Sequence, residues 1–384
     1  MAITFMTGFE GQAVGVDGIV TTTGTVAYST AQKRTGAASL RINPATSANG
    51  YASFVSASFA GYVNFGFYVA TLPIGERIIY GLNSSTYINA TIDSTGRIRL
   101  YEGTTLIGLS SSLLTTNTWY WIGIRNIPGT SVVFLTINGK DEITGTATTA
   151  SATGYLGCSD STANGAIDFY YDDLIIDDTG FLEPSKVGLL LPISDNARST
   201  LWTGGSGGTT NLYDAVNNTP PVGSATESNT TQIEHAGGAA GTTDLYAADM
   251  TTYTTAGVNA GDSVIALQGI VSWGEDISTG TKLLSYAGVS NPSWTGESSI
   301  DVSTGHGSGA VTTFSTGTDY WNERRSAIVT NPSVTLGTSP VMRVTRPETA
   351  SRVASVCFMG MYVAWTPAVA GVASFPYVGG GYYP

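Results

Sequence analysis

Apolar and polar residues alternate with a period of two along much of this chain, in short runs bounded by Gly, Asn, Asp, Ser or Pro. This period places successive side chains on opposite faces of a strand, and the bounding residues are those that turns require. In the first half such runs cover residues 3–9, 38–43, 51–54, 62–69, 77–80, 87–92, 97–101, 119–125, 132–137 and 167–176. The pattern predicts a β-sandwich of about a dozen short strands.

One tight turn can be assigned from two residues alone. Asn138-Gly139 separates two apolar runs, and both central residues of a type I′ hairpin turn need positive φ, which Asn and Gly tolerate best. We therefore predict a hairpin centred on this pair.

The sequence pattern of the second half predicts another sandwich with longer loops. The acids and Gly that follow Ile176, together with Pro184, indicate a short linker, and strand-like runs return at residues 263–273, 281–286, 341–344 and 352–365. No segment shows a convincing helical period, and the best short candidate is Asp244–Met250. The predicted organisation is an all-β chain of two tandem β-sandwich (jelly-roll) domains at 1–180 and 187–367, followed by an extended Gly/Tyr/Pro-rich C-terminal arm at 368–384.

The composition favours a rigid binding or building block over an enzyme. Only 2 His, 2 Cys and 11% charged residues occur among 384, while Gly numbers 48 and Tyr 20. Few side chains are therefore available for proton transfer or nucleophilic attack. Cys158 and Cys357 lie far apart in the sequence and match neither a metal motif nor a disulfide framework, so we expect two small buried hydrophobes.

The net charge of -12 argues against nucleic acid and against anionic membrane surfaces as partners. Phosphate groups are bound by clustered Lys and Arg, and no basic tail is present. The first residues lack the cationic region of a secretory signal, and no apolar run approaches the ~18 residues that span a bilayer.

Histidine-based catalysis has little support in the sequence. His235 and His306 both lie in Gly-rich surroundings, where we expect exposed loop residues. No Gly-x-Ser-x-Gly elbow on a strand–helix turn is present to place a serine nucleophile, and no His, Cys and acid cluster has the spacing of a zinc site.

Paired carboxylates would be the basis of a glycosidase, because hydrolysis of a sugar bond needs two acids roughly 5–9.5 Å apart. Two residues at i and i+2 of one strand could supply them. Neither Asp168, Asp172 and Asp173 nor Glu275 and Asp276 form such a pair. We therefore predict solvated acids at strand ends.

Two further groups of residues are candidates for ligand binding. Asp172, Asp173, Asp177 and Asp178 could gather around Ca²⁺, although they do not match an EF-hand loop, and the alternative is an acidic sheet edge that stays soluble. Trp294 lies in a turn, where it could stack on a sugar or pack locally.

The first 180 residues resemble the concanavalin A-like (laminin-G or pentraxin-like) jelly roll. The motifs that carry the resemblance are Phe5–Glu10, Gly36–Arg41, Val63–Val69, Thr118–Ile124, Val133–Gly139 and Ile167–Asp177. The layout of the whole chain is similar to that of virion proteins of tailed bacteriophages, in which such a domain is followed by a second Gly/Thr-rich β domain. No residue matches the sugar and metal ligands of the lectin-like members.

This resemblance implies a non-enzymatic structural protein located in the virion, as a capsid decoration or spike, or as a tail, baseplate or fibre component. Its partners would be copies of itself and other virion proteins, and no cofactor is expected. The alternative is an adhesin that binds a glycan on the host surface, and the third possibility is a polysaccharide-degrading enzyme.

The C-terminal arm generates the first testable prediction. Phe375, Tyr377, Tyr382 and Tyr383 would expose a large apolar surface if the arm were free, so we expect them to dock on a neighbouring protein. Deletion of residues 371–384 should leave both domains folded, as judged by circular dichroism, but abolish incorporation into particles. Normal incorporation of the truncated protein would contradict this role.

Overall fold

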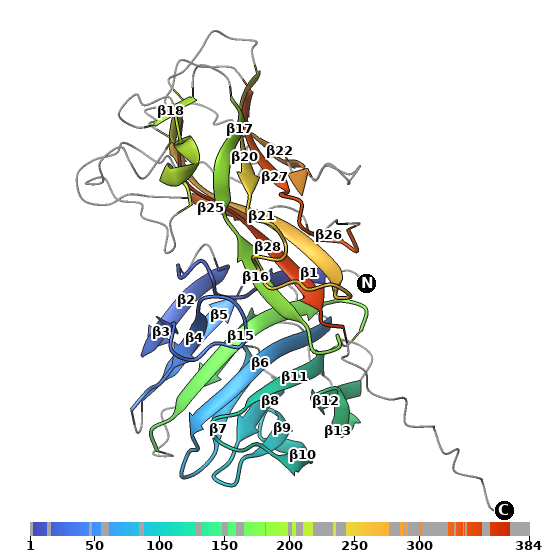
Figure 1. The fold of residues 1–384 in the computed structure, drawn as a ribbon. Coiled ribbons are helices and arrows are strands. Elements are labelled where there is room, and N and C mark those ends of the chain that lie inside the picture. The colour runs from blue at the N-terminus through green and yellow to red at the C-terminus, as the bar shows by residue number, and fades with distance from the viewer. Residues whose placement is uncertain are drawn as a thin grey trace, which may run out of the picture.

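The computed structural model describes β-sheets in both halves of the chain (Figure 1). The described residues are 3–13, 17–45, 48–54, 61–83, 88–126, 132–147, 153–158, 165–180, 182–198, 202–204, 210–217, 233–235, 243–275, 285–287, 289–290, 299–301, 322–325, 328–332, 334, 336–347 and 354–368. Every strand pair in this part of the chain is antiparallel. The all-β prediction is confirmed.

The first sandwich consists of two sheets. Sheet A contains, in spatial order, β13 (Lys140–Thr146), β12 (Val132–Ile137), β11 (Trp119–Asn126), β6 (Gly61–Thr71), β15 (Asp168–Asp177), β4 (Ser39–Ile42) and β3 (Val26–Ser29), and β1 (Ile3–Thr7) also pairs with β15. Sheet B contains β10 (Thr105–Leu113), β9 (Arg97–Glu102), β8 (Ile88–Ile92), β7 (Arg77–Asn83), β14 (Thr153–Cys158), β5 (Gly50–Phe54) and β2 (Ile19–Gly24). Neighbouring strands are often distant in sequence, as in a jelly roll.

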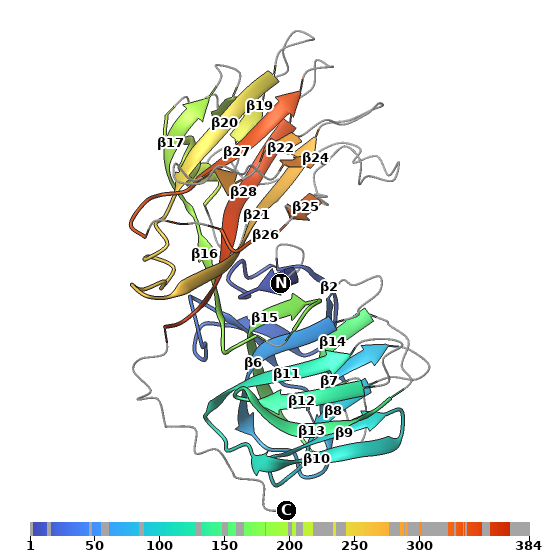
Figure 2. The same cartoon turned by 90° about the vertical axis from the view of Figure 1, so that its right-hand side faces the viewer.

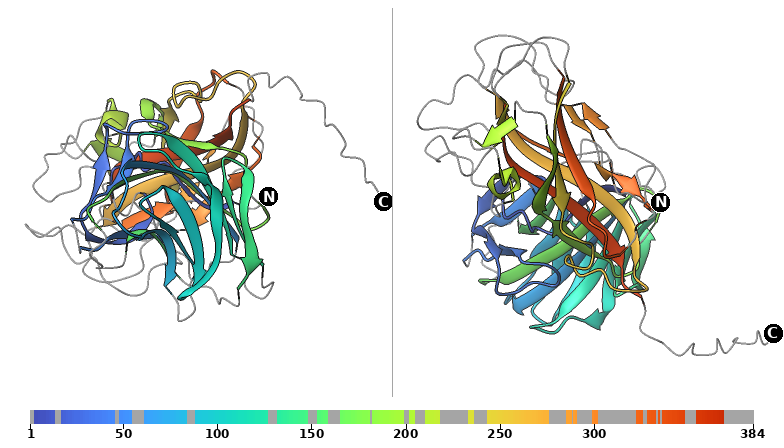
Figure 3. Two further views of the ribbon diagram at one scale, coloured as in Figure 1. Left: turned by 90° about the horizontal axis from the view of Figure 1, so that it is seen from below. Right: turned by 45° about the horizontal axis from the view of Figure 1, so that its top comes forward.

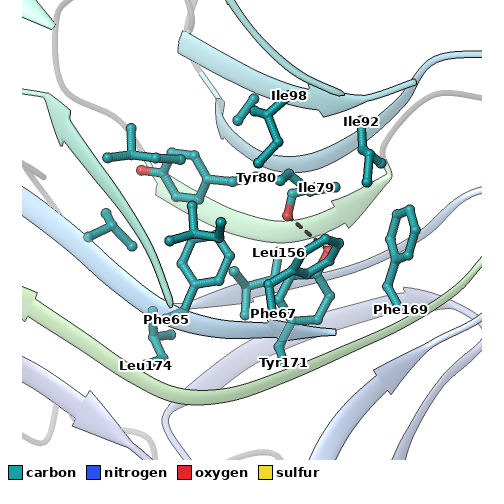
Figure 4. Packing of buried hydrophobic residues seen from close by; sticks show 14 of the residues in the cluster. Phe65, Phe67, Ile79, Tyr80, Ile92, Ile98, Leu156, Phe169, Tyr171 and Leu174 are labelled. Atoms are coloured by element: carbon teal, nitrogen blue, oxygen red, sulfur yellow. Dashed lines mark hydrogen bonds between the residues drawn. The ribbon is translucent and has the colours of Figure 1, made fainter. Parts of the chain in front are cut away.

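Aromatic and branched side chains fill the space between sheets A and B (Figure 4). Phe67 packs edge-on against Phe169, with ring centroids 5.2 Å apart, and also contacts Tyr171. The hydroxyl of Tyr171 donates a 2.9 Å hydrogen bond to the carbonyl of Ile79 in the opposite sheet. The one polar group of this buried ring is thereby satisfied, so the ring adds packing without an orphaned hydroxyl.

The second sandwich is built in the same way from later strands. Sheet C contains β18 (Trp202–Gly204), β19 (Ile233–His235), β28 (Ala354–Thr366), β21 (Ser263–Glu275) and β25 (Asn322–Arg325), with β16 (Lys186–Leu190) paired to β28 and β26 (Val329–Thr330) paired to β21. Sheet D contains β17 (Pro192–Arg198), β20 (Thr243–Met250), β27 (Val341–Pro347), β22 (Ser285–Ala287) and β24 (Ser299–Asp301), with β23 (Val289–Ser290) paired to β27. Among the residues described here, one 3-10 turn is also present, Leu212–Ala215.

Sheet A of the first sandwich lies against sheet C of the second (Figures 1 and 2). The tilted view in Figure 3 shows the long red and yellow-orange strands of sheet C crossing over the first sandwich. A separate apolar cluster occupies this junction, made of Ile3, Met6, Trp121, Ile175, Leu182, Val187, Ile265, Ala266, Ile270, Phe358, Tyr362 and Ala364. The face of sheet A that would otherwise meet water is therefore partly buried by the second sandwich.

The predicted linker is part of this junction. Leu182 is buried there, and its carbonyl accepts a 3.0 Å hydrogen bond from the indole Nε1 of Trp121. Trp121 itself is only 2% exposed. Because both the indole and the linker backbone are fixed by this bond, the linker holds the sandwiches together and does not act as a loose spacer.

Two local predictions have opposite outcomes. The hairpin at Asn138-Gly139 is confirmed, with φ of 53° and 79° at the two residues and Ile137 paired with Lys140. The helical candidate Asp244–Met250 is wrong, because this segment lies within strand β20. Tyr246 and Ala248 point into the second core, and pairing with β17 and β27 on both sides outweighs local helix propensity. No helix in the described part of the chain is long and apolar enough to span a membrane.

Candidate functional site

A β-bulge in the middle of β15 brings two consecutive acids to the same face of sheet A. Asp172 pairs with Gly66 of β6 and Ile175 pairs with Asn64, so β15 holds one residue more than its partner here. The extra residue is Asp173, whose φ of 51° lies in the left-handed region that Asp tolerates better than most residues. In a regular strand the two carboxyl groups would point to opposite faces.

Both aspartates hold the loop between β3 and β4. Asp172 Oδ2 accepts hydrogen bonds from the backbone N–H groups of Arg34 (2.7 Å) and Thr35 (3.1 Å). Asp173 Oδ2 accepts from the guanidinium Nη1 of Arg34 (2.5 Å) and from the hydroxyl of Thr35 (3.1 Å). Both carboxyl groups are completely buried. The prediction of solvated strand ends is therefore wrong for this pair.

Glu10 extends the same clamp to the end of the loop. Its Oε2 accepts hydrogen bonds from the backbone N–H groups of Ala37 (2.5 Å) and Ala38 (3.2 Å). A Cβ atom at Gly36 would overlap the Glu10 carboxyl group, and Gly36 also has a φ of +59°. Only glycine meets both requirements at this position.

Two carboxyl groups of this cluster reach the second sandwich. Asp17 Oδ1 accepts hydrogen bonds from the N–H of Gly11 (3.1 Å) and from the hydroxyl of Tyr362 on β28. Asp173 Oδ1 accepts from the N–H of Val187 on β16, at 2.6 Å. We name Glu10, Asp17, Asp172 and Asp173 the junction carboxylates, because they lie where the two sandwiches meet.

Burial shifts the titration of three junction carboxylates. Desolvation, together with the nearby charges of Asp173 and Asp17, raises the pKa of Glu10 from its ordinary value of 4.5 to about 9. Desolvation and the charges of Asp173 and Glu10 also raise the pKa of Asp172. Desolvation raises the pKa of Asp173 as well, although the Arg34 guanidinium opposes that shift. One guanidinium thus faces several buried acids, and Glu10 retains its proton at neutral pH.

A cavity of about 240 Å³ adjoins Glu10 at the junction. The first sandwich contributes Glu10, Gly36 and Ala37 to its lining. The second sandwich contributes residues 188, 189 and 191, which follow the linker, and residues 255 and 256, which follow β20. Oε1 of Glu10 is buried beneath Gly36 and has no hydrogen-bond partner among the described residues.

The four predicted calcium ligands do not form one site. Asp172 and Asp173 bind the β3–β4 loop, whereas Asp177 Oδ1 accepts hydrogen bonds from the N–H groups of Thr179 (2.7 Å) and Gly180 (3.0 Å) in its own turn. Asp178 is exposed. Across the ranges given above, no three His, Cys, Asp or Glu side chains are grouped as metal ligands.

The other residues singled out from the sequence lie apart from the junction or outside the description. Asp168 forms an ion pair with Arg41, with Nε–Oδ1 and Nη2–Oδ2 distances of 2.7 and 2.9 Å. Residues whose position or side chain lies outside the described part of the chain are Cys158, His235, Glu275, Asp276, Trp294, His306, Cys357, Phe375, Tyr377, Tyr382 and Tyr383.

Three of the motifs that carried the family resemblance meet at the junction. The first supplies Glu10, the second supplies Gly36 and its neighbours, and the last supplies Asp172 and Asp173. The sequence pattern predicted Asp172 and Asp173 as strand ends and assigned no role to the Glu10 or Asp17 side chain. The available signal was the position of Asp172 and Asp173 inside an apolar ten-residue run.

No family model matches the sequence, and no curated protein sequence matches it either. Among solved structures, a cellulose induced protein aligns with 46% of this chain and 98% of its own, at 13% identity and a TM-score of 0.37. A transglycosylase in complex with NAG aligns over 46% and 84%, at 14% identity and a TM-score of 0.36. An alginate lyase from Corynebacterium sp. aligns over 39% and 80%, at 12% identity and a TM-score of 0.32. These values do not place the chain in any of the three families, and the sandwich assignment rests on the sheets themselves.

Glu10 generates a prediction about pH. Because the unfolded chain ionises this group near 4.5 and the folded chain near 9, the folded state binds the extra proton between these values. The stabilisation from Glu10 is therefore complete below pH 4.5 and is lost as the pH rises toward 9. Glu10→Gln mimics the protonated form and removes this titration. As the pH rises, the free energy of unfolding should therefore fall less steeply for Glu10→Gln than for wild type, and the two slopes should differ by up to about 1.4 kcal/mol per pH unit.

Chemical denaturation at pH 5, 7 and 8.5 measures this difference. The exposed residue Glu183 provides a matched control, because Glu183→Gln should give a pH profile parallel to that of wild type. Parallel profiles for wild type and Glu10→Gln would contradict the assignment.

Proposed function

We propose that this chain is a non-enzymatic structural subunit of a bacteriophage virion that acts on the particle surface through protein–protein assembly. Its partners would be further copies of itself and other virion proteins. A row of exposed leucines on strand β10 carries the assembly part of the proposal. The layout of the sequence supports the virion part.

The leucine row lies on the outer strand of sheet B. Leu106, Leu109 and Leu113 are 44%, 41% and 47% exposed. Strand β10 is at the end of the first sandwich remote from the second sandwich (Figures 1 and 2). Leucines spaced along one strand at an end of the molecule offer apolar surface for burial against another protein.

The free edge of β10 is protected against strand addition. Oε2 of Glu142 on β13 accepts hydrogen bonds from the backbone N–H groups of Ser111 (2.7 Å) and Ser112 (2.9 Å). A negatively charged side chain that occupies these donors blocks pairing with a foreign strand. Contact at this end would therefore use leucine side chains and not backbone hydrogen bonds.

The junction supports assembly because it makes the two sandwiches one body. Apolar packing around Trp121, together with hydrogen bonds from Tyr362 and Val187 to junction carboxylates, spans the contact. A subunit with fixed geometry loses little conformational entropy when it binds its neighbours, so it can occupy equivalent positions in an assembly.

Antibody labelling of intact particles from the source lysate tests the virion location. Electron microscopy should show label on the particle surface, spread over the head for a decoration protein or confined to the tail for a baseplate or fibre component. Absence of the protein from purified particles would contradict the proposal.

A charge placed in the leucine row tests the mechanism. Leu109→Asp should reduce incorporation into particles at least tenfold, because an ionised carboxyl group would have to be buried at the contact. Ile74→Asp is the matched control, since Ile74 is 76% exposed and lies outside β10. Both variants should keep the wild-type melting temperature within a few degrees, as surface changes cost about 0.5 kcal/mol or less. Equal incorporation of both variants would rule out the leucine row.

The outer face of sheet B favours a second candidate function, glycan binding by an adhesin. Glu76 accepts hydrogen bonds from the hydroxyl groups of Thr91 and Tyr101, both at 2.8 Å, and Arg99 bridges Glu76 and Asp93 at 3.4 and 3.1 Å. The side chains of Glu76 and Arg99 are about one-third exposed. Such fixed acceptors and donors beside an aromatic ring match what sugar hydroxyl groups bind.

Glycan-array binding of the intact protein distinguishes the two candidates. An adhesin should give saturable binding that Arg99→Ala weakens at least tenfold and that the exposed control Asp178→Asn leaves unchanged. Cleavage of a bound polysaccharide would instead indicate the third possibility, a degrading enzyme. If no glycan on the array binds, the adhesin candidate is rejected and assembly remains as the proposed function.

A further inference from the structure

The leucine row stands opposite a polar strand. The pairs of the β9–β10 ladder are Leu106 with Tyr101, Leu109 with Arg99, and Leu113 with Arg97. Directly opposite residues of paired strands point to the same face of a sheet. Ile98 and Leu100, which alternate with these β9 residues, lie in the core, so both rows are on the outer face of sheet B. A protein that covers the leucines therefore also covers this part of β9 (Figure 2).

Arg99 pairs with two acids of this face. Its guanidinium lies 3.1 Å from Asp93 Oδ2 and 3.4 Å from Glu76 Oε1. Oδ1 of Asp93 accepts three further hydrogen bonds, from the N–H and the hydroxyl of Thr95 and from the backbone N–H of Arg97. Both carboxylates are therefore already occupied.

Arg97 is left with an open charge. It is partly exposed, and in the part of the chain that the structure describes its guanidinium forms no ion pair and no hydrogen bond. Solvent reaches the guanidinium nitrogens, unlike Nε of Arg125, which is buried without a partner. A guanidinium presents parallel N–H donors that match the two oxygens of a carboxylate. An incoming carboxylate can therefore bind to Arg97 directly.

Burial of the leucine row against a neighbour would remove the Arg97 charge from water. A buried charge without a partner is costly, and a carboxylate that accepts two hydrogen bonds from the guanidinium offsets that cost. A neighbour that offers only apolar side chains would therefore bind less tightly than one that also offers an acid. Charge complementarity thus specifies the partner of this surface.

We propose that the neighbouring subunit which covers the leucine row presents an acidic side chain to Arg97. Its carboxylate would pair with the guanidinium, and apolar side chains beside it would pack on Leu109 and Leu113. This inference deepens the proposed assembly function and rests on it, because it states which chemistry the neighbour must carry at the leucine row.

Sodium hexanoate is a suitable probe, because it joins a carboxylate to a short apolar chain. It is titrated into the intact protein at constant ionic strength, and binding is followed by the NMR signals of the Arg97 Nε–H group and of the Leu109 and Leu113 methyl groups. We expect saturable shifts and a loss of affinity of at least tenfold in Arg97→Gln. Lys33→Gln is the matched control, since Lys33 is an exposed cation outside sheet B and its loss should leave the affinity unchanged.

Two further ligands separate the parts of the contact. n-Hexanol keeps the apolar chain but lacks the charge, and sodium glucuronate keeps the carboxylate but lacks the apolar chain. Each should bind at least tenfold more weakly than hexanoate. Equal affinity for hexanol and hexanoate would overturn the role of Arg97. Tighter binding of glucuronate would overturn the protein partner in favour of an acidic glycan.

Incorporation into particles tests the inference with the natural neighbour. Arg97→Glu should reduce incorporation at least tenfold, because two acids would then face each other, whereas Lys33→Glu should be incorporated like wild type. Both variants should keep the wild-type melting temperature within a few degrees, since they change surface residues. Normal incorporation of Arg97→Glu alongside a defect in Leu109→Asp would overturn the acidic contact and leave the leucine row and the virion location standing.

Discussion

The structure depends on the burial of four carboxyl groups between two β-sandwiches. Removing a carboxylate from water costs several kcal/mol, and hydrogen bonds to a charged group return about 1.5–3 kcal/mol each. Asp172 and Asp173 each accept three such bonds, which reduce that cost, although desolvation still raises the pKa of both groups. Glu10 accepts two, both on one oxygen, and they do not outweigh the desolvation that raises its pKa to about 9.

The requirement for so many donors determines the local structure around the junction. The bulge in β15 turns Asp173 to the side of Asp172, and a glycine at position 36 lets the β3–β4 loop approach Glu10 closely. The loop then presents consecutive backbone N–H groups to the acids. Val187 and Tyr362 supply further donors, so Asp173 and Asp17 gain these hydrogen bonds only when the second sandwich is in place. The buried acids of one sheet thereby help to fix how the two sandwiches meet.

Local sequence signals predicted local structure well. The Asn138-Gly139 hairpin follows from the positive φ of two adjacent residues, and the alternating runs follow from the period of a strand. The junction could not be predicted in the same way, since a strict period of two assigns Asp172 and Asp173 to opposite faces. Contacts between distant segments also decide which strand residues face the second sandwich, and a local pattern does not contain this information. The strand Thr243–Met250 shows the same limit, because pairing on both sides decided its structure.

The central claim is that the junction carboxylates join the two sandwiches into one cooperative body. Differential scanning calorimetry of the intact chain tests it most directly, because two-state unfolding gives equal calorimetric and van't Hoff enthalpies. We predict a single transition at neutral pH with a ratio of these enthalpies near one. Two separate transitions, each accounting for about half of the total enthalpy, would show that the sandwiches unfold independently and would contradict the claim.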